Sequence, residues 1–170
     1  MKLNPLGLAV LLMAFAGSAL AQNHTSGTIK CGKQDTSQSI DVGDQPGHTL
    51  TVEKGSCTWS VPYEMAGLKS TTITETDSVD VNGPKAQVRG YAVTTMDNGD
   101  KAYVRYQGTG IVKDGVPTGE GTWSYTGGSG KLKGLKGKGT YKTSGPEGDT
   151  QVEGEYSLPD PSATAKKKGG

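Results

Sequence analysis

The stretch that decides the fold is TGGSGKLKGLKGKGTY, residues 126–141. Its glycines let the backbone turn sharply and lie close to a neighbouring strand, because a positive φ carries no Cβ penalty at glycine. Short β-rich runs at residues 122–125 and 139–142 flank the stretch. We therefore predict a glycine-rich corner between two strands, with Leu132 and Leu135 turned into the core.

The corner lacks the spacing of the common phosphate-binding loops. A P-loop needs GxxxxGK followed by Ser or Thr, so that backbone N–H groups hold phosphate and the hydroxyl binds magnesium, but here Lys131 is followed by Leu132. A dinucleotide-binding GxGxxG also fails, since Lys133 stands where the third glycine belongs. Lysines on such a corner are more often a solvated face than an anion-binding patch. Nucleotide and anion binding at the corner are both disfavoured.

The N-terminal segment has the pattern of an export signal. A positive charge at Lys2 precedes an apolar run over residues 6–20, and an A-x-A cleavage site ends at Ala21. The run is short for a membrane span, and no later apolar run is long enough to cross a bilayer. We expect a signal peptide over residues 1–21 and an exported protein, periplasmic or extracellular.

The remaining chain is one domain long and electrically balanced. Removing the signal leaves 149 residues (170 − 21), with 17 basic residues (18 − 1, for Lys2) against 17 acidic ones. A net charge near zero disfavours a nucleic-acid binder, which carries a clear basic excess. The only phenylalanine, Phe15, also lies in the signal. This thin apolar supply suits a small closed barrel, which has only one inward face to fill.

Two cysteines remain after the signal, Cys31 and Cys57. In an exported chain the default interpretation is one disulfide. A metal pair or a redox centre is the alternative, but there is no CxxC, and neither His24 nor His48 has ligand-like spacing to a cysteine. We predict a disulfide between the N-terminal segment and an early strand, with no metal site and no cofactor.

Turn signals separate a series of β-rich runs, which predicts an all-β fold. The clearest hairpin signal is Asp-Asn-Gly-Asp at residues 97–100, where Asn-Gly favours the positive φ values of a type I′ turn. Gly55 is expected to mark a turn or bulge. Residues 22–39 are polar and should lead in loosely until Cys31 ties them down. The expected strands are 48–53, 56–60, 70–81, 86–96, 101–112, 119–126, 137–143 and 151–158.

Hairpin connections between these strands favour one antiparallel up-and-down barrel of about eight strands. A β-sandwich is the alternative. The barrel domain is expected over residues 22–159. Residues 160–170 end in a lysine run and are expected to be a disordered tail.

Residues 119–142, GEGTWSYTGGSGKLKGLKGKGTYK, resemble the signature Gly-Gly-(Ser/Thr)-Gly-x-(apolar)-x-Gly-x-x-Gly of the allene oxide cyclase-like barrel superfamily. That group includes plant allene oxide cyclases, dirigent proteins and uncharacterised secreted bacterial proteins. Residues 96–110 also resemble the bacterial members. The resemblance implies an antiparallel barrel with a central cavity, often a dimer or trimer. It carries no catalytic residue onto this chain. The matched positions are Gly127, Gly128, Ser129, Gly130, Leu132, Gly134 and Gly137.

Alternating strand faces supply the candidate ligand-binding residues. If one face of the central strands points into the barrel, it places two guanidinium groups beside phenols, with carboxylates from another strand. Such a lining would bind a small anionic or phenolic ligand. In the other interpretation the face points outward and carries ordinary cross-strand charge pairs. Both interpretations stay open, because alternation cannot tell which face is inside. The candidates are Glu75, Asp77, Arg89, Tyr91, Tyr103 and Arg105, with Gln107 beside them.

Three functions remain open. The preferred one is an exported, non-catalytic barrel that binds a small ligand or a partner. The second is an isomerase- or cyclase-like enzyme acting on a small hydrophobic substrate in the lumen, which needs an inward ionisable group with a perturbed pKa. The third is a structural envelope-interaction protein with a filled lumen and an exposed apolar patch. The residues that distinguish the second from the first are Glu75, Asp77, Arg89 and Arg105.

Overall fold

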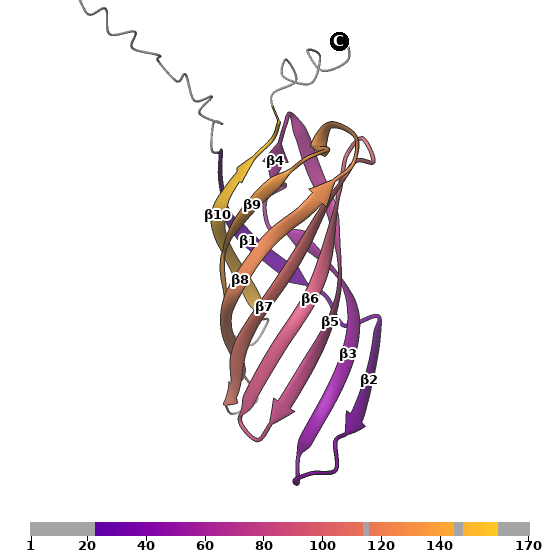
Figure 1. Cartoon of the computed structure of the whole chain (residues 1–170), viewed down its shortest axis with the longest axis vertical. Helices are drawn as coiled ribbons and strands as arrows, with labels where there is room; N and C mark the ends of the chain where they lie inside the picture. Colours follow the sequence, from indigo (N-terminus) through magenta and orange to yellow (C-terminus); the bar gives the residue numbers. More distant parts are fainter. Residues whose placement is uncertain (1–22, 114–115, 145–147, 160–170) are drawn as a thin grey trace, which may run out of the picture.

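The chain forms a β-barrel, seen in a computed structural model that describes residues 23–113, 116–144 and 148–159 (Figure 1). The predicted signal peptide and lysine-rich tail lie outside the described residues. No helix within the described ranges has the length and apolar character needed to cross a bilayer. The elements are β1 (Asn23–Cys31), β2 (Thr36–Asp41), β3 (His48–Trp59), β4 (Glu64–Met65), β5 (Leu68–Asn82), β6 (Lys85–Met96), β7 (Lys101–Lys113), β8 (Val116–Gly128), the 3-10 turn η1 (Gly130–Leu132), β9 (Lys136–Ser144) and β10 (Asp149–Ser157).

The strands close into a ring. Their order is β2-β3-β1-β10-β9-β8-β7-β6-β5-β4, and β3 pairs with β5 as well as with β1. Each strand from β5 to β10 pairs antiparallel with the next strand in the chain. The predicted up-and-down barrel is therefore confirmed. Strand β2 extends β3 into an arm at the lower end of the barrel in Figure 1.

The seam between β1 and β3 is the shortest pairing in the ring. It has three register pairs, against seven between β1 and β10. One of the three pairs is Cys31 opposite Cys57, and these residues form the predicted disulfide. The covalent link therefore lies where backbone hydrogen bonds contribute least to closing the barrel.

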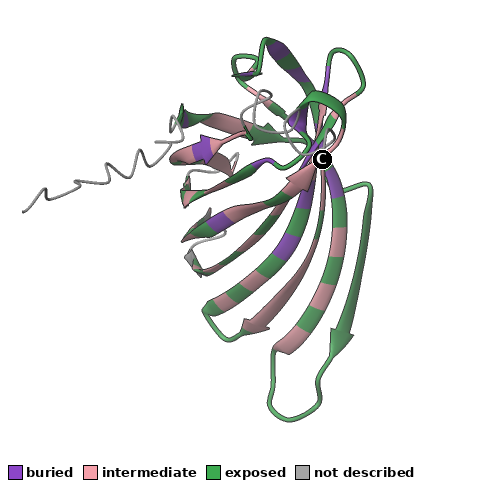
Figure 2. Cartoon of the chain, turned by 45° about the horizontal axis from the view of Figure 1, so that its top comes forward, coloured by how far each residue is buried: buried purple, intermediate pink, exposed green. Residues whose placement is uncertain are grey.

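The glycine-rich corner closes the upper end of the barrel. Leu132 and Leu135 are 0% and 2% exposed and pack in a cluster with Met65, as predicted for the corner leucines. The Asp100 carboxylate accepts a hydrogen bond of 2.9 Å from the Lys131 N–H. This contact ties the corner to the turn between β6 and β7. Figure 2 shows buried residues gathered at this end, and exposed residues alternating with less exposed ones along the strands.

The turn between β6 and β7 differs in type from the prediction. The hairpin at residues 97–100 is confirmed, and the Gly99 N–H donates to the Met96 carbonyl at 2.9 Å. Gly99 has a φ of 87°, but among the described non-glycine residues only Ala66 has a positive φ. A type I′ turn needs positive φ at both central residues, so that prediction is wrong. The Asn98 side chain instead bonds to both the backbone N–H and the carboxylate of Asp100.

Two other expectations at the N-terminal end are wrong. Residues 22–39 were expected to be loose, but most of them form β1 and β2. Both strands are polar, and β1 pairs with β10, which lies far along the sequence. Gly55 is no turn, because β3 runs through it without a break and pairs it with Glu75. The Gln34 side-chain amide lies over Gly55, in the space that a Cβ would occupy.

Removal of the disulfide tests the weak seam. A Cys31→Ser/Cys57→Ser double variant should lose about 3 kcal/mol of unfolding free energy, because the cross-link spans 26 residues of the unfolded chain. Urea unfolding followed by tryptophan fluorescence measures the loss. Thr58→Ser, an exposed position in the same seam, is the control and should unfold like the unmodified protein. An unchanged midpoint in the double variant would contradict the role given to the seam.

Candidate functional site

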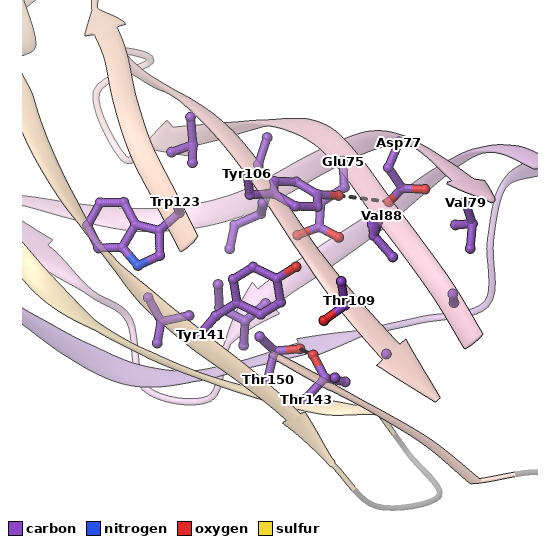
Figure 3. Close-up of a pocket in the computed structure, with 18 of the residues that line it drawn as sticks. Glu75, Asp77, Val79, Val88, Tyr106, Thr109, Trp123, Tyr141, Thr143 and Thr150 are labelled. Carbon is purple, nitrogen blue, oxygen red and sulfur yellow. Dashed lines mark hydrogen bonds between the residues drawn. The ribbon is translucent and has the colours of Figure 1, made fainter. Parts of the chain in front are cut away.

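The end of the barrel opposite the glycine-rich corner holds a cavity of about 340 Å³. Side chains from β1, β3 and β5 to β10 line it. Most of the wall is apolar, with Val79, Val88 and Val104 among its residues. Its two carboxyl groups lie together, where Glu75, Asp77 and Tyr106 point into the same space, while Thr143 and Thr150 lie elsewhere on the wall (Figure 3).

Asp77 and Tyr106 meet across an intervening strand. The register pairs Asp77 with Gly90, and Gly90 with Tyr106, so the three residues form one row on the inner face. The Tyr106 hydroxyl donates a hydrogen bond of 2.7 Å to Asp77 Oδ2. A Cβ on Gly90 would lie 2.6 Å from that hydroxyl and 2.7 Å from Asp77 Cβ. Glycine is therefore required here to let the ring cross β6 and reach the carboxylate.

The same packing recurs around the barrel. Tyr141 lies over Gly121, and Trp123 lies over Gly139 and Gly154, in each case closer than an added Cβ would allow. Aromatic rings resting on glycines of adjoining strands are a known way to stabilise glycine in sheets. Alternate glycines in β7, β8 and β9 are the sequence signal for these inward rings. The candidate residues were chosen without that signal, so Tyr106, Tyr141 and Trp123 were not among them.

The two carboxyl groups are electrostatically unusual. Burial, followed by the charge of Asp77, raises the pKa of Glu75 from 4.5 to about 7. Burial also raises the pKa of Asp77; the Tyr106 hydrogen bond opposes this rise, and the charge of Glu53 adds to it. Asp77 Oδ1 is buried and has no hydrogen-bond partner. An unpaired acceptor of this kind inside a protein is energetically costly.

The predicted site residues fall on two opposite faces. Glu75 and Asp77 line the cavity, as the ligand-pocket interpretation required of them. The other candidates do not line it: the inner face of β6 and β7 carries Gly90 and Tyr106, which turns their odd-numbered neighbours outward. These five residues therefore lie as the outward-facing interpretation expected, and the phenols in the lumen are those of other tyrosines, Tyr106 and Tyr141 among them. The outward residues are Arg89, Tyr91 (63% exposed), Tyr103 (36% exposed), Arg105 and Gln107.

One group near the cavity has the composition of a metal site. The sulfurs of Cys31 and Cys57 lie within 4.8 Å of a Glu75 carboxylate oxygen, with Cys31 Sγ 3.7 Å from Glu75 Oε2. Metal ligation by cysteine requires the thiolate, and these sulfurs are bonded to each other. With the disulfide intact, the group offers a metal only one carboxylate.

Comparison with known proteins finds no family model and no curated protein that matches the chain. Several solved structures are similar to it, including two with TM-scores below 0.5. One is a protein of unknown function of the DUF3224 family from Shewanella oneidensis MR-1, with a TM-score of 0.49 and 18% identity over 82% of this chain and 100% of that one. The other is a pterocarpan synthase dirigent protein, with a TM-score of 0.42 and 13% identity over 80% and 83% of the two chains. Similarity at this level assigns neither family nor activity.

Substitution of Gly90 tests the packing that brings Tyr106 to Asp77. Gly90→Ala should lower the unfolding free energy by about 1–3 kcal/mol, because the new methyl group displaces the ring or the strand. Urea unfolding measures the change. Gly32→Ala is the matched control, since the nearest atom to its Cβ would be 3.7 Å away. Equal stabilities of the two variants would show that the ring does not rest on Gly90.

The raised pKa of Glu75 predicts a pH dependence of stability. Below about pH 4.5 the group is protonated in both states, and above about pH 7 it is ionised in both. Between these values the unfolded state releases its proton first, so the unfolding free energy falls as the pH rises, by on the order of 3 kcal/mol in total. Urea titrations from pH 4 to pH 8 measure this fall. Glu75→Gln should flatten it, and parallel curves for the two proteins would refute the assignment.

Proposed function

We propose that the protein is an exported β-barrel that binds a small, largely apolar ligand in its lumen without transforming it. The observation that carries this proposal is the 340 Å³ cavity, with its largely apolar wall and the carboxyl groups of Glu75 and Asp77 beside Tyr106. Ligand pockets are concave and mostly apolar, and a few convergent polar groups orient the ligand. The unpartnered Asp77 Oδ1 offers a ready acceptor for such a ligand.

Two features support export. The N-terminal residues have the charge, apolar run and small-residue site of a signal peptide. The Cys31–Cys57 disulfide is of the kind that persists in oxidising compartments. Membership of the allene oxide cyclase-like superfamily, and assembly into a dimer or trimer, follow from the sequence resemblance and remain part of the proposal.

A second candidate function is acid–base catalysis in the lumen, of the isomerase or cyclase type. Glu75 favours it, because a carboxyl group with a pKa of about 7 can donate or accept a proton near neutral pH. Tyr106 and Asp77 lie in the same cavity and could orient a substrate. The structural envelope role is less well supported, since it called for a filled lumen.

Filling the lumen tests the binding function. The chain's two tryptophans, Trp59 and Trp123, both line the cavity, so their fluorescence reports on occupancy. Val88→Phe should weaken binding of the neutral probe 2-phenylethanol at least about tenfold, because the ring takes up cavity volume. Val93→Phe, on the opposite face of the same strand, is the control and should bind as the unmodified protein does.

Native mass spectrometry of protein from an exporting host gives an independent measurement. An extra mass that is lost on denaturation and absent from Val88→Phe would support binding and show the ligand's size. Equal binding by both phenylalanine variants and the unmodified protein would overturn the proposal.

A further inference from the structure

We propose that the lumen selects a small organic cation, a protonated amine with an apolar body, over neutral and anionic molecules of the same shape. The inference rests on the proposed binding in the lumen and specifies the charge of the ligand. It departs from the sequence expectation of an anionic or phenolic ligand, which depended on inward-pointing arginines.

The charge of the lining is the first argument. Among the described residues that line the cavity, Glu75 and Asp77 are the only ones with ionisable acidic or basic groups apart from the tyrosines, and none is Lys, Arg or His. Glu53, opposite Asp77 on β3, adds a third negative charge near the same place. The nearest guanidinium groups on the paired strands, Arg89 and Arg105, are exposed on the outer face. An anion would find no charged group of opposite sign among these lining residues.

The second argument is the unpartnered oxygen. Tyr106 satisfies Asp77 Oδ2, whereas Asp77 Oδ1 is buried without a partner. An ammonium group supplies both the missing hydrogen bond and the opposite charge, and charge-assisted hydrogen bonds are the stronger kind. A cation also relieves the repulsion between Glu75 and Asp77. A neutral hydroxyl supplies the hydrogen bond alone.

The rest of the cavity suits the body of such a ligand. Tyr106, Tyr141 and Trp123 present aromatic rings to the space, and the faces of aromatic rings attract cations. The valines of the wall provide apolar contact. The Trp59 indole N–H is a second buried group without a partner, but it is a neutral donor and does not change the sign of the charge.

Desolvation of the ammonium group opposes binding and must be weighed against these gains. Removing an isolated charge from water is costly, and a buried ion pair often recovers little of that cost. In this lumen the carboxylates are desolvated by folding, before any ligand arrives. Binding therefore adds the desolvation of one partner only, and pairing with two carboxyl groups offsets it.

The test is isothermal titration calorimetry with three probes of matched shape: 2-phenylethylamine, 2-phenylethanol and phenylacetate. At pH 8, Glu75 is largely ionised, since its pKa is about 7, and an alkyl amine is still protonated. The amine should bind at least about tenfold more tightly than the alcohol, and phenylacetate should bind more weakly than either. Glu75→Gln/Asp77→Asn should bring amine and alcohol to equal affinity. Glu120→Gln, on the exposed face of β8, should leave the preference intact.

The outcomes separate the two proposals. If alcohol and amine bind equally well to the unmodified protein, or if phenylacetate binds best, charge selection is overturned while lumen binding stands. If none of the three binds, both proposals fall. Retention of the amine preference in the double variant would also overturn the inference. Binding of the alcohol to that variant shows that it is folded.

Discussion

Aromatic rings resting on glycines of neighbouring strands are the contact on which the rest of this barrel depends. Side chains on the inner face of a small barrel compete for very little space. Placing a ring opposite a residue without a Cβ lets a large side chain lie along the wall instead of across the lumen. Tyr106 over Gly90, and Trp123 over Gly139, follow this rule. The rings thus line the lower half of the barrel and leave a cavity between them.

The same small residues create the electrostatics of the site. Glu75 is paired with Gly55 on one side and Ala92 on the other, and Asp77 is paired with Gly90. Larger neighbours would fill the space that the two carboxyl groups occupy. Because Gly55, Ala92 and Gly90 are small and apolar, the carboxyl groups lie in an environment poor in water, which raises the pKa of both. The charge of Glu53, the other partner of Asp77, adds to the rise in the Asp77 pKa. The packing rule and the chemistry of the site therefore have one structural origin.

Much of the fold could be predicted from the sequence, because its strongest signals are local. Turn residues separate the strands β5 to β10, and the leucines of the glycine-rich corner identify the upper core. The strands β1 and β2 could not be predicted, since both are polar and β1 takes most of its hydrogen bonds from β10, far along the chain. The disulfide was predictable because only two cysteines remain after the signal. The short seam that it closes was visible only in the pairing register.

Only part of the site could be predicted, because alternation does not identify the inner face of a strand. Glu75 and Asp77 were expected to share one strand face and do line the cavity, but the alternation that places them together does not say which face of β6 and β7 accompanies them. A shift of one residue exchanges Arg89 and Arg105 for Gly90 and Tyr106, and with them a lumen of balanced charge for an acidic one. The glycine decides between the two, because only the face that carries Gly90 lets Tyr106 reach Asp77. The net charge of the lumen thus depends on a residue that carries neither charge nor side chain.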